Sequence, residues 1–226
     1  MPSEFPGSPK LLKGAMVVYA SDTAGSPAKV IPFQYNPDQV TRTLARRAES
    51  EGSGKGSKQD VLRVEGAPIE KISLSVVLDA TDQLGAQVPD DTVRKHGLFP
   101  VLATLELLLY PSSEQVQQRE EQVQSGAIQI SSGRLPLTLL VWGKSRVVPV
   151  LLESFSVAEQ AFDPNLNPIR AKVDLSLRVL TNRELEKGTQ GYKAFSTYHK
   201  EKERLAGLHQ APGGQGSKIR TLLPSG

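Results

Sequence analysis

The strongest constraint on the fold is one stretch, residues 169–180, in which apolar and polar side chains alternate almost without exception. Successive side chains of a β-strand point to opposite faces, so this pattern predicts a strand with one buried face and one charged face. At about 3.3 Å per residue such a strand approaches roughly 40 Å, about twice the usual length or more. We therefore expect a sheet that extends beyond its own core. The inward set is Ala171, Val173, Leu175, Leu177 and Val179, and the outward set is Arg170, Lys172, Asp174, Ser176 and Arg178.

Further strands are predicted where short apolar or alternating runs are bounded by turn residues. The Asn36–Pro37–Asp38 segment is a strong turn signal, because proline fixes φ while Asn and Asp bond their own backbone. A second turn is expected within 22–27, which is rich in Gly, Ser and Pro. The class is therefore mainly β with helices. The predicted strands are 15–19, 29–35, 40–48, 69–78, 137–142 and 147–158.

One helix is predicted within the body of the chain, over 98–109. Its leucines and Val101 recur at three- and four-residue spacing and form one apolar stripe, and Pro111 follows as a stop. Such a helix would cover one side of a sheet. The stripe consists of Leu98, Val101, Leu102, Leu105, Leu108 and Leu109.

The remaining segments are too polar, or too rich in Gly, Pro and Ser, to bury a core. We predict a flexible arm at 1–14, a flexible loop at 49–60 and an exposed helix or loop at 112–126. The body spans 15–182. The extension 183–226 is predicted to be a charged helix, to about residue 208, followed by a disordered tail over 211–226. The helix carries a narrow apolar edge made of Tyr192, Phe195, Tyr198 and Leu205.

Composition excludes several classes of function. The chain has no cysteine, which removes disulfide frameworks, thiolate zinc sites and cysteine nucleophiles. Residues 183–226 hold eight basic and four acidic side chains, so the rest carries a net charge of −1 against +3 overall. This is not the dense basic stripe of a nucleic-acid-binding protein. The longest apolar run, 97–110, is too short to span a bilayer, and the N-terminus lacks a secretory pattern, so we expect synthesis in the cytosol.

No motif supports catalysis or a cofactor. The glycine-rich segment 52–56 fails as a phosphate-binding loop, because Lys55 is followed by Gly56 instead of Ser or Thr. The three histidines, at 96, 199 and 209, are not spaced as metal ligands. Asp79 and Asp82 could form a carboxylate pair, but a turn in which they bond backbone or solvent is the better interpretation. No Gly-x-Ser-x-Gly elbow occurs. We predict no enzyme activity, no cofactor and no metal.

Three segments, in order, resemble a known family. They are PFQYNP at 32–37, LPLTLLVWG at 135–143, and FDPNLNPIRA at 162–171, which leads into the alternating strand. Together they resemble the tube-type domain of contractile injection systems, the phage-tail-like particles, over roughly residues 15–183. The resemblance implies a tube-protein-like β-barrel or sandwich packed by one helix. Many relatives carry a LysM-like module after this domain. No compact βααβ pattern is found after residue 183, so the helix at 192–208 is a candidate replacement as a docking element.

Within that group the chain looks like the baseplate adaptor that joins the inner tube to the spike hub. The resemblance implies a ring of six copies that contacts the hub, the inner tube protein and other baseplate proteins, without nucleic acid and without direct membrane insertion. Two alternatives stay open: the inner tube (Hcp-like) protein itself, or a cell-wall or nucleic-acid binding module that uses the basic tail. Whether the particle is released or stays in the cytoplasm is also open.

The motifs supply a set of candidate structural and interface residues. Trp142 is interpreted as a core or inter-sheet side chain, with Gly143 allowing a tight turn beside it. Arg170 starts the long strand, where it either pairs across a subunit boundary or is solvated. The full set is Phe33, Asn36, Pro37, Trp142, Gly143, Phe162, Asp163, Asn167, Pro168, Arg170, Tyr192 and Tyr198.

Overall fold

The structure, a computed structural model, describes residues 13–19, 29–47, 64, 66–85, 90–126 and 133–209. The predicted turn at 22–27, the loop at 49–60 and the tail at 211–226 lie outside the described residues, as does the predicted arm apart from its last two positions.

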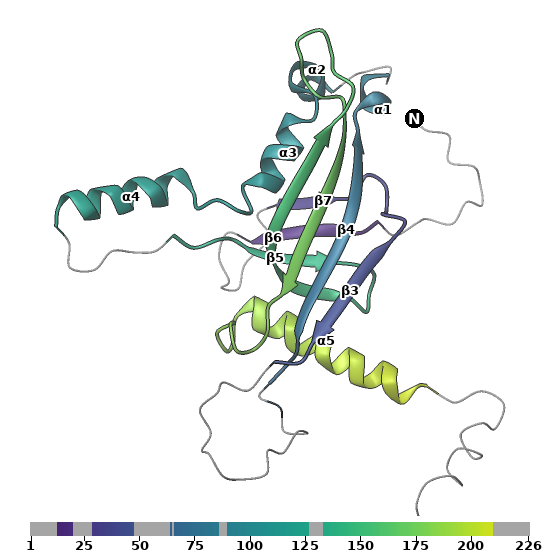
Figure 1. Cartoon of the computed structure of the whole chain (residues 1–226), viewed down its shortest axis with the longest axis vertical. Helices are drawn as coiled ribbons and strands as arrows, with labels where there is room; N and C mark the ends of the chain where they lie inside the picture. The colour runs from purple at the N-terminus through teal and green to yellow at the C-terminus, as the bar shows by residue number, and fades with distance from the viewer. Residues whose placement is uncertain are drawn as a thin grey trace, which may run out of the picture.

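The described part of the chain forms one antiparallel sheet of seven strands that does not close (Figure 1). The strand order is β2-β1-β5-β6-β7-β4-β3, so β2 and β3 are the two edges. The mainly β class is confirmed. The strands are β1 (Ala15–Tyr19), β2 (Lys29–Pro32), β3 (Val40–Ala45), β4 (Ile69–Asp79), β5 (Leu137–Val141), β6 (Val147–Glu159) and β7 (Arg170–Val179).

The long strand β6 joins two halves of the sheet. Its first residues pair with β5, whereas Val150–Glu159 pair with β7. The register shifts between Leu152 and Ser154, which leaves Glu153 as an extra residue, and such bulges bend a strand. In Figure 1 the short strands β1, β2 and β5 accordingly cross behind β4, β6 and β7. The arrangement is that of a sandwich made by one bent sheet.

The alternation in residues 169–180 produces the centre of the core, as predicted. Ile72 faces Leu177 and Val76 faces Val173 across the β4–β7 ladder, and all four side chains are buried. Ser73 and Ser176 pair on the opposite face of the same ladder. Cross-strand apolar pairs of this kind stabilise the sheet on one face and leave the other to water.

Five helices accompany the sheet in the described ranges, and α3 fills the predicted position. Leu98, Leu102, Leu105 and Leu108 are all buried in the main core, which confirms the predicted stripe. Regular α-helix ends at Glu106, because Leu108 and Leu109 donate to carbonyls three residues back and so tighten the last turn. The helices are α1 (Thr81–Leu84), α2 (Asp91–His96), α3 (Phe99–Glu106), α4 (Ser113–Gln124) and α5 (Gln190–Gly207).

Two helices lie in the segments that the sequence predicted as a polar helix or loop and as a charged helix. The stretch at 112–126 contains α4, which has no buried residue and extends away from the sheet (Figure 1). The C-terminal helix begins at Gln190 instead of residue 183, because Gly188 adopts a φ of +93° and the Thr189 hydroxyl caps the next turn. Phe195 and Tyr198 are buried in the core, so the first half of α5 packs on the sheet.

Candidate functional site

The candidate interface residues fall mainly into three clusters, each of which joins segments far apart in the sequence. The Trp142 cluster consists of Gly14, Phe33, Asn36 and Trp142. The corner is the β6–β7 connection, residues 162–168. The Glu70 cluster consists of Arg42, Glu70, Tyr198 and Lys202.

The Trp142 cluster ties the start of β1 to the turn after β2 and to the end of β5. Asn36 Oδ1 accepts a hydrogen bond from the Gly14 N–H at 2.9 Å, and the Gly14 carbonyl accepts one from the Phe33 N–H at 2.8 Å. The Phe33 and Trp142 ring centroids are 6.4 Å apart. A Cβ at Gly14 would lie 2.6 Å from the Trp142 ring, so only glycine fits. Trp142 is half-buried and packs against the core.

The turn beside Trp142 closes as the sequence predicted. Gly143 has a φ of +74°, in the left-handed region that favours glycine. The Trp142 N–H donates to the Arg146 carbonyl at 2.7 Å, which completes the connection from β5 to β6.

Gln34, for which the sequence predicted no role, links the segment after β2 to the end of β4. Its side chain forms two hydrogen bonds there, which we call the clamp. Its amide nitrogen donates to the Asp79 carbonyl at 2.6 Å, and its amide oxygen accepts from the Asp79 N–H at 2.8 Å. One side chain thus satisfies both polar groups of one peptide residue 45 positions away. The clamp joins the two halves of the bent sheet.

We expect Gln34→Ala to lower the free energy of unfolding by about 1–3 kcal/mol, because two part-buried backbone groups lose their partner. Urea denaturation monitored by circular dichroism measures this. Gln39→Ala is the matched control, since Gln39 forms an exposed hydrogen bond to Thr41 only two residues away. Equal losses for the two variants would contradict the clamp.

The corner is held by Asp163. Its Oδ1 accepts from the N–H groups of Asn165 at 2.8 Å and Asn167 at 2.9 Å, and its Oδ2 accepts from the Asn167 side-chain amide at 2.8 Å. The Asn167 hydrogen bond is the main reason that the pKa of Asp163 lies below its ordinary value. Leu166, at the tip, has a φ of +65° and an exposed side chain. Phe162 is also exposed, so the corner presents two apolar side chains on a rigid loop.

The corner is anchored to the junction between α2 and α3. The Asn167 amide donates to the Lys95 carbonyl at 3.1 Å, and the Pro168 carbonyl accepts from the Leu98 N–H at 2.8 Å. A Cβ at Gly97 would lie 2.4 Å from the Pro168 oxygen, so the two segments touch at their backbones.

The end of β4 and the start of β7 meet at Asp79 and Arg170. Asp79 Oδ1 accepts from both the N–H and the hydroxyl of Thr81, and the hydroxyl bond is the main reason that the pKa of Asp79 is lowered. The predicted turn role of Asp79 is therefore confirmed. The Arg170 Nε lies 3.9 Å from Asp79 Oδ2, and the arginine side chain is about half exposed.

The Glu70 cluster is a group of charges around one buried carboxylate, between β3, β4 and α5. Glu70 is only 3% exposed. Its Oε1 accepts from Arg42 Nε at 2.8 Å and from the Tyr198 hydroxyl at 2.8 Å, and its Oε2 accepts from Lys202 Nζ at 2.7 Å. Lys202 Nζ also lies 4.1 Å from the centre of the Tyr198 ring.

Two opposed effects set the ionisation of this cluster. Burial alone would raise the pKa of Glu70, but the hydrogen bonds from Lys202, Arg42 and Tyr198 outweigh it, so the pKa is lowered and the carboxylate stays charged. Burial raises the pKa of Tyr198, and its hydrogen bond to Glu70 raises it further, so the phenol stays protonated. The cluster therefore fixes α5 to the sheet through an ionised, hydrogen-bonded network.

Sequence reasoning missed Arg42, Glu70 and Lys202. One signal was present: Glu70 lies in phase with Ile72 and Leu74, so the alternation of β4 places a carboxylate on the inward face. Tyr198 was predicted as an apolar contact, and its hydroxyl proves to be the polar part of the contact. The interface roles of all twelve candidates stay predictions.

A family model described as contractile injection system tube protein matches residues 10–187. That range includes all seven strands and α1–α4, and covers well over half of the chain. The chain belongs to the contractile injection system tube protein family. The predicted resemblance is confirmed. No curated protein matches the chain.

Membership gives this tube-family chain a general role. The chain is a structural component of a contractile injection system particle, and it assembles with copies of itself and with other components of the system. The matched range ends before α5, so the helix that completes the Glu70 cluster lies beyond it. None of the helices in the described ranges combines the length and apolar character needed to cross a bilayer.

Proposed function

We propose that the chain is the baseplate adaptor of a contractile injection system, forming a ring of six copies that joins the spike hub to the inner tube. A closed ring of identical subunits needs two different, complementary faces on each subunit. The observation that carries the proposal is the open sheet, whose edges β2 and β3 lie at opposite ends of the strand order. Among the described residues, no strand pairs with the outer side of β2 or β3, so each edge can offer backbone groups to a neighbouring strand. The ring size and the adaptor position follow from the resemblance.

The composition of the edges supports pairing between copies. Val30 on β2 and Leu44 on β3 are exposed apolar side chains. Exposed apolar edge strands promote association unless a partner covers them, and natural proteins avoid them when no partner exists. Edge-to-edge pairing of β2 with β3 would cover both residues.

The helix α5 favours the role of baseplate adaptor. The alternative role, that of the inner tube protein, is the one that the family description favours. An inner tube subunit needs only the repeating tube fold. Here an additional helix is docked beyond the family-matched range through Phe195, Tyr198 and Lys202. A helix of this kind gives the first ring a surface that differs from the repeating layers.

We expect the double variant Val30→Lys/Leu44→Lys to weaken self-association by tenfold or more, because each buried Val or Leu contributes roughly 1.5 kcal/mol or more. Analytical ultracentrifugation measures the change, and circular dichroism checks the fold. The control is Leu205→Lys/Leu208→Lys, which adds the same two charges at exposed apolar positions at the C-terminal end of α5. Equal weakening by the control would contradict pairing through the sheet edges.

The position in the particle separates the two candidates. A compact tag is fused after residue 209, because truncation or fusion at an earlier point would disturb α5, whose Phe195 and Tyr198 belong to the core. In electron micrographs of intact particles, the adaptor gives tag density at one level beside the spike. Tag density that repeats along the tube would show that the chain is the inner tube protein and not the adaptor.

A further inference from the structure

We propose that residues 218–223 of one copy of this chain, the C-terminal segment, bind in the groove beside α4 of another copy. The segment follows α5 after a stretch rich in Gly and Pro. This contact goes beyond the ring proposed above, because it involves neither sheet edge and does not depend on the position in the particle. It requires only that the chain assembles with copies of itself, which the family implies.

The helix α4 receives little packing from the described part of its own subunit. It has twelve residues, none of them buried, and it extends away from the sheet (Figure 1). Isolated helices shorter than about 12–15 residues are marginal in water, so most helical stability in proteins comes from packing. A segment bound along one side of α4 would supply that packing.

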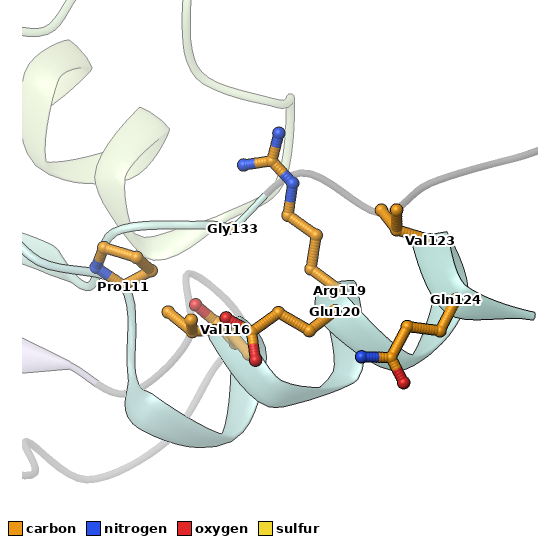
Figure 2. Close-up of a pocket in the computed structure, with 8 residues that line it drawn as sticks. Pro111, Val116, Arg119, Glu120, Val123, Gln124 and Gly133 are labelled. Atoms are coloured by element: carbon orange, nitrogen blue, oxygen red, sulfur yellow. The ribbon is translucent and has the colours of Figure 1, made fainter.

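A groove runs along α4, between the helix and the chain at Gly133 (Figure 2). Pro111, Val116 and Val123 give it apolar walls. The two valines are seven residues apart, so they lie on one side of α4 about two turns from each other. The groove has a volume of about 370 Å³, which is within the range of sites that hold small ligands, so a few side chains fill it.

One polar atom in the wall of the groove lacks a partner. Gln115 Oε1 is buried and accepts no hydrogen bond from any residue that the structure describes. A buried acceptor without a donor is unfavourable, and a ligand that supplies an N–H group removes that cost. The groove therefore suits an occupant that carries N–H donors as well as apolar side chains.

The C-terminal segment, whose sequence is KIRTLL, carries both kinds of group. Ile219, Leu222 and Leu223 are three and four residues apart, so they share one side of any helix that forms on binding. Lys218 and Arg220 supply N–H donors. Three aliphatic anchors at this spacing are typical of a helix that binds in an apolar groove.

The residues that flank the segment favour a short helix. Ser217 is a preferred residue for the start of a helix, and Pro224 is typical of the position just after its end. A segment with only three apolar side chains cannot bury a core of its own, but it becomes ordered when a partner covers those side chains. We therefore expect the segment to fold only in the groove.

Net charge also favours this occupant. Residues 99–134, which include α4, hold four acidic and two basic side chains, so their net charge is −2. The two acidic and two basic side chains of 90–95 cancel and leave that value unchanged. Residues 209–226 hold two basic side chains and no acidic one, so their net charge is +2 with histidine neutral. The segment and the region around the groove therefore attract each other.

The positions of α4 and α5 favour a contact between two copies. In Figure 1, α4 and the C-terminal end of α5 leave the sheet on opposite sides. The stretch 210–217 can span at most about 29 Å when extended, so it carries the segment outward from the end of α5 toward a neighbouring subunit. A groove on one side and a segment leaving from the other are the two different faces that a head-to-tail contact needs.

Disulfide cross-linking tests this contact, because the natural chain has no cysteine. Full chains with Val123→Cys or Leu222→Cys are purified separately, mixed and oxidised. We expect the mixture to give several-fold more covalent dimer than either variant alone. Gln118→Cys mixed with Leu222→Cys is the matched control, since Gln118 is also exposed on α4 but does not line the groove. A yield no higher than that of the control would overturn the contact.

The double variant Val123→Cys/Leu222→Cys tests for a contact within one chain. We expect it to form covalent dimers and larger species, because each copy then carries both halves of the contact. A double variant that closes on itself as a monomer, while the mixture of single variants gives no dimer, would show that the segment folds back on its own subunit. That result would overturn the contact between copies.

Replacing the apolar anchors provides an independent readout. We expect Ile219→Ser/Leu223→Ser, added to the Leu222→Cys chain, to lower the cross-linking yield several-fold, because the groove walls are apolar. Thr221→Ser is the control within the same segment and should leave the yield unchanged. A yield that falls only when Lys218 and Arg220 are replaced by Gln, and not when the anchors are replaced, would overturn binding in the groove and indicate attraction by charge alone.

Discussion

Replacing both Arg42 and Lys202 by methionine is expected to destabilise the chain by about 3–5 kcal/mol at pH 7, because Glu70 would stay buried without a cation. Methionine keeps much of the length and apolar character of the replaced side chains, so packing is largely retained. Chemical denaturation followed by tryptophan fluorescence and circular dichroism measures the loss.

The pH dependence of stability provides a second test, because it is expected to have opposite signs in the natural chain and in the double variant. In the natural chain the folded-state pKa of Glu70 lies below its ordinary 4.5, so the stability that it contributes is present above that value and is lost as pH falls below it. In the double variant burial is no longer outweighed, so the pKa of Glu70 rises. The folded variant then takes up a proton before the unfolded chain does, and its stability increases as pH falls from 7 toward 5.

Two controls isolate the buried charge. Adding Glu70→Leu to the double variant should recover most of the lost stability, because an apolar side chain then occupies the apolar site. Lys71→Met removes a cation from the outward face of the same strand, where it pairs with Glu153 in an exposed contact, and should cost no more than about 1 kcal/mol. A double variant that is no less stable than Lys71→Met would contradict the structural role assigned to the Glu70 cluster.

Gly97→Ala is expected to lower the free energy of unfolding by about 2–4 kcal/mol. The new Cβ would lie 2.4 Å from the Pro168 carbonyl oxygen, which is backbone and cannot rotate away, and overpacking of this kind costs about 1–3 kcal/mol. The φ of +54° adds about 1 kcal/mol, because side chains other than glycine rarely adopt it. The substitution would also separate the corner from the α2–α3 junction. Urea denaturation gives the magnitude.

Gly143→Ala separates the two contributions. Gly143 also has a positive φ, of +74°, but no atom lies within 4 Å of the position its Cβ would take. We expect this variant to lose only about 1 kcal/mol, from the backbone conformation alone. If both variants lost the same amount, the close approach of Gly97 to Pro168 would not be a significant contact.

The Glu70 cluster also bears on how the tube-family fold is adapted. The cluster joins β3 and β4, inside the family-matched range, to a helix beyond it. A helix held only by exposed apolar contacts would detach easily, whereas the buried hydrogen bond from Tyr198 and the part-buried one from Lys202 fix its rotation on the sheet. Leu205 and Leu208, on the last turns of α5, remain exposed and available to a partner.

The sequence by itself determined the parts of the fold that depend on local periodicity. The alternation at 169–180 specified β7 and its buried face, because a strand places every second side chain on the same side. The leucine spacing specified the inward stripe of α3, and Gly143 marked a turn through its own backbone preference. These features need no knowledge of distant residues.

Only the tertiary structure decided which distant segments meet. Tyr198 reaches Glu70 across 128 positions and Arg42 across 156, and no local pattern records such a pairing. The same holds for the clamp of Gln34 on Asp79, the bend of β6 at Glu153 and the direction of α4. Periodicity shows which face of an element is buried, but a buried face is compatible with many partners. The choice among them follows from shape, charge and hydrogen bonding once the chain is compact.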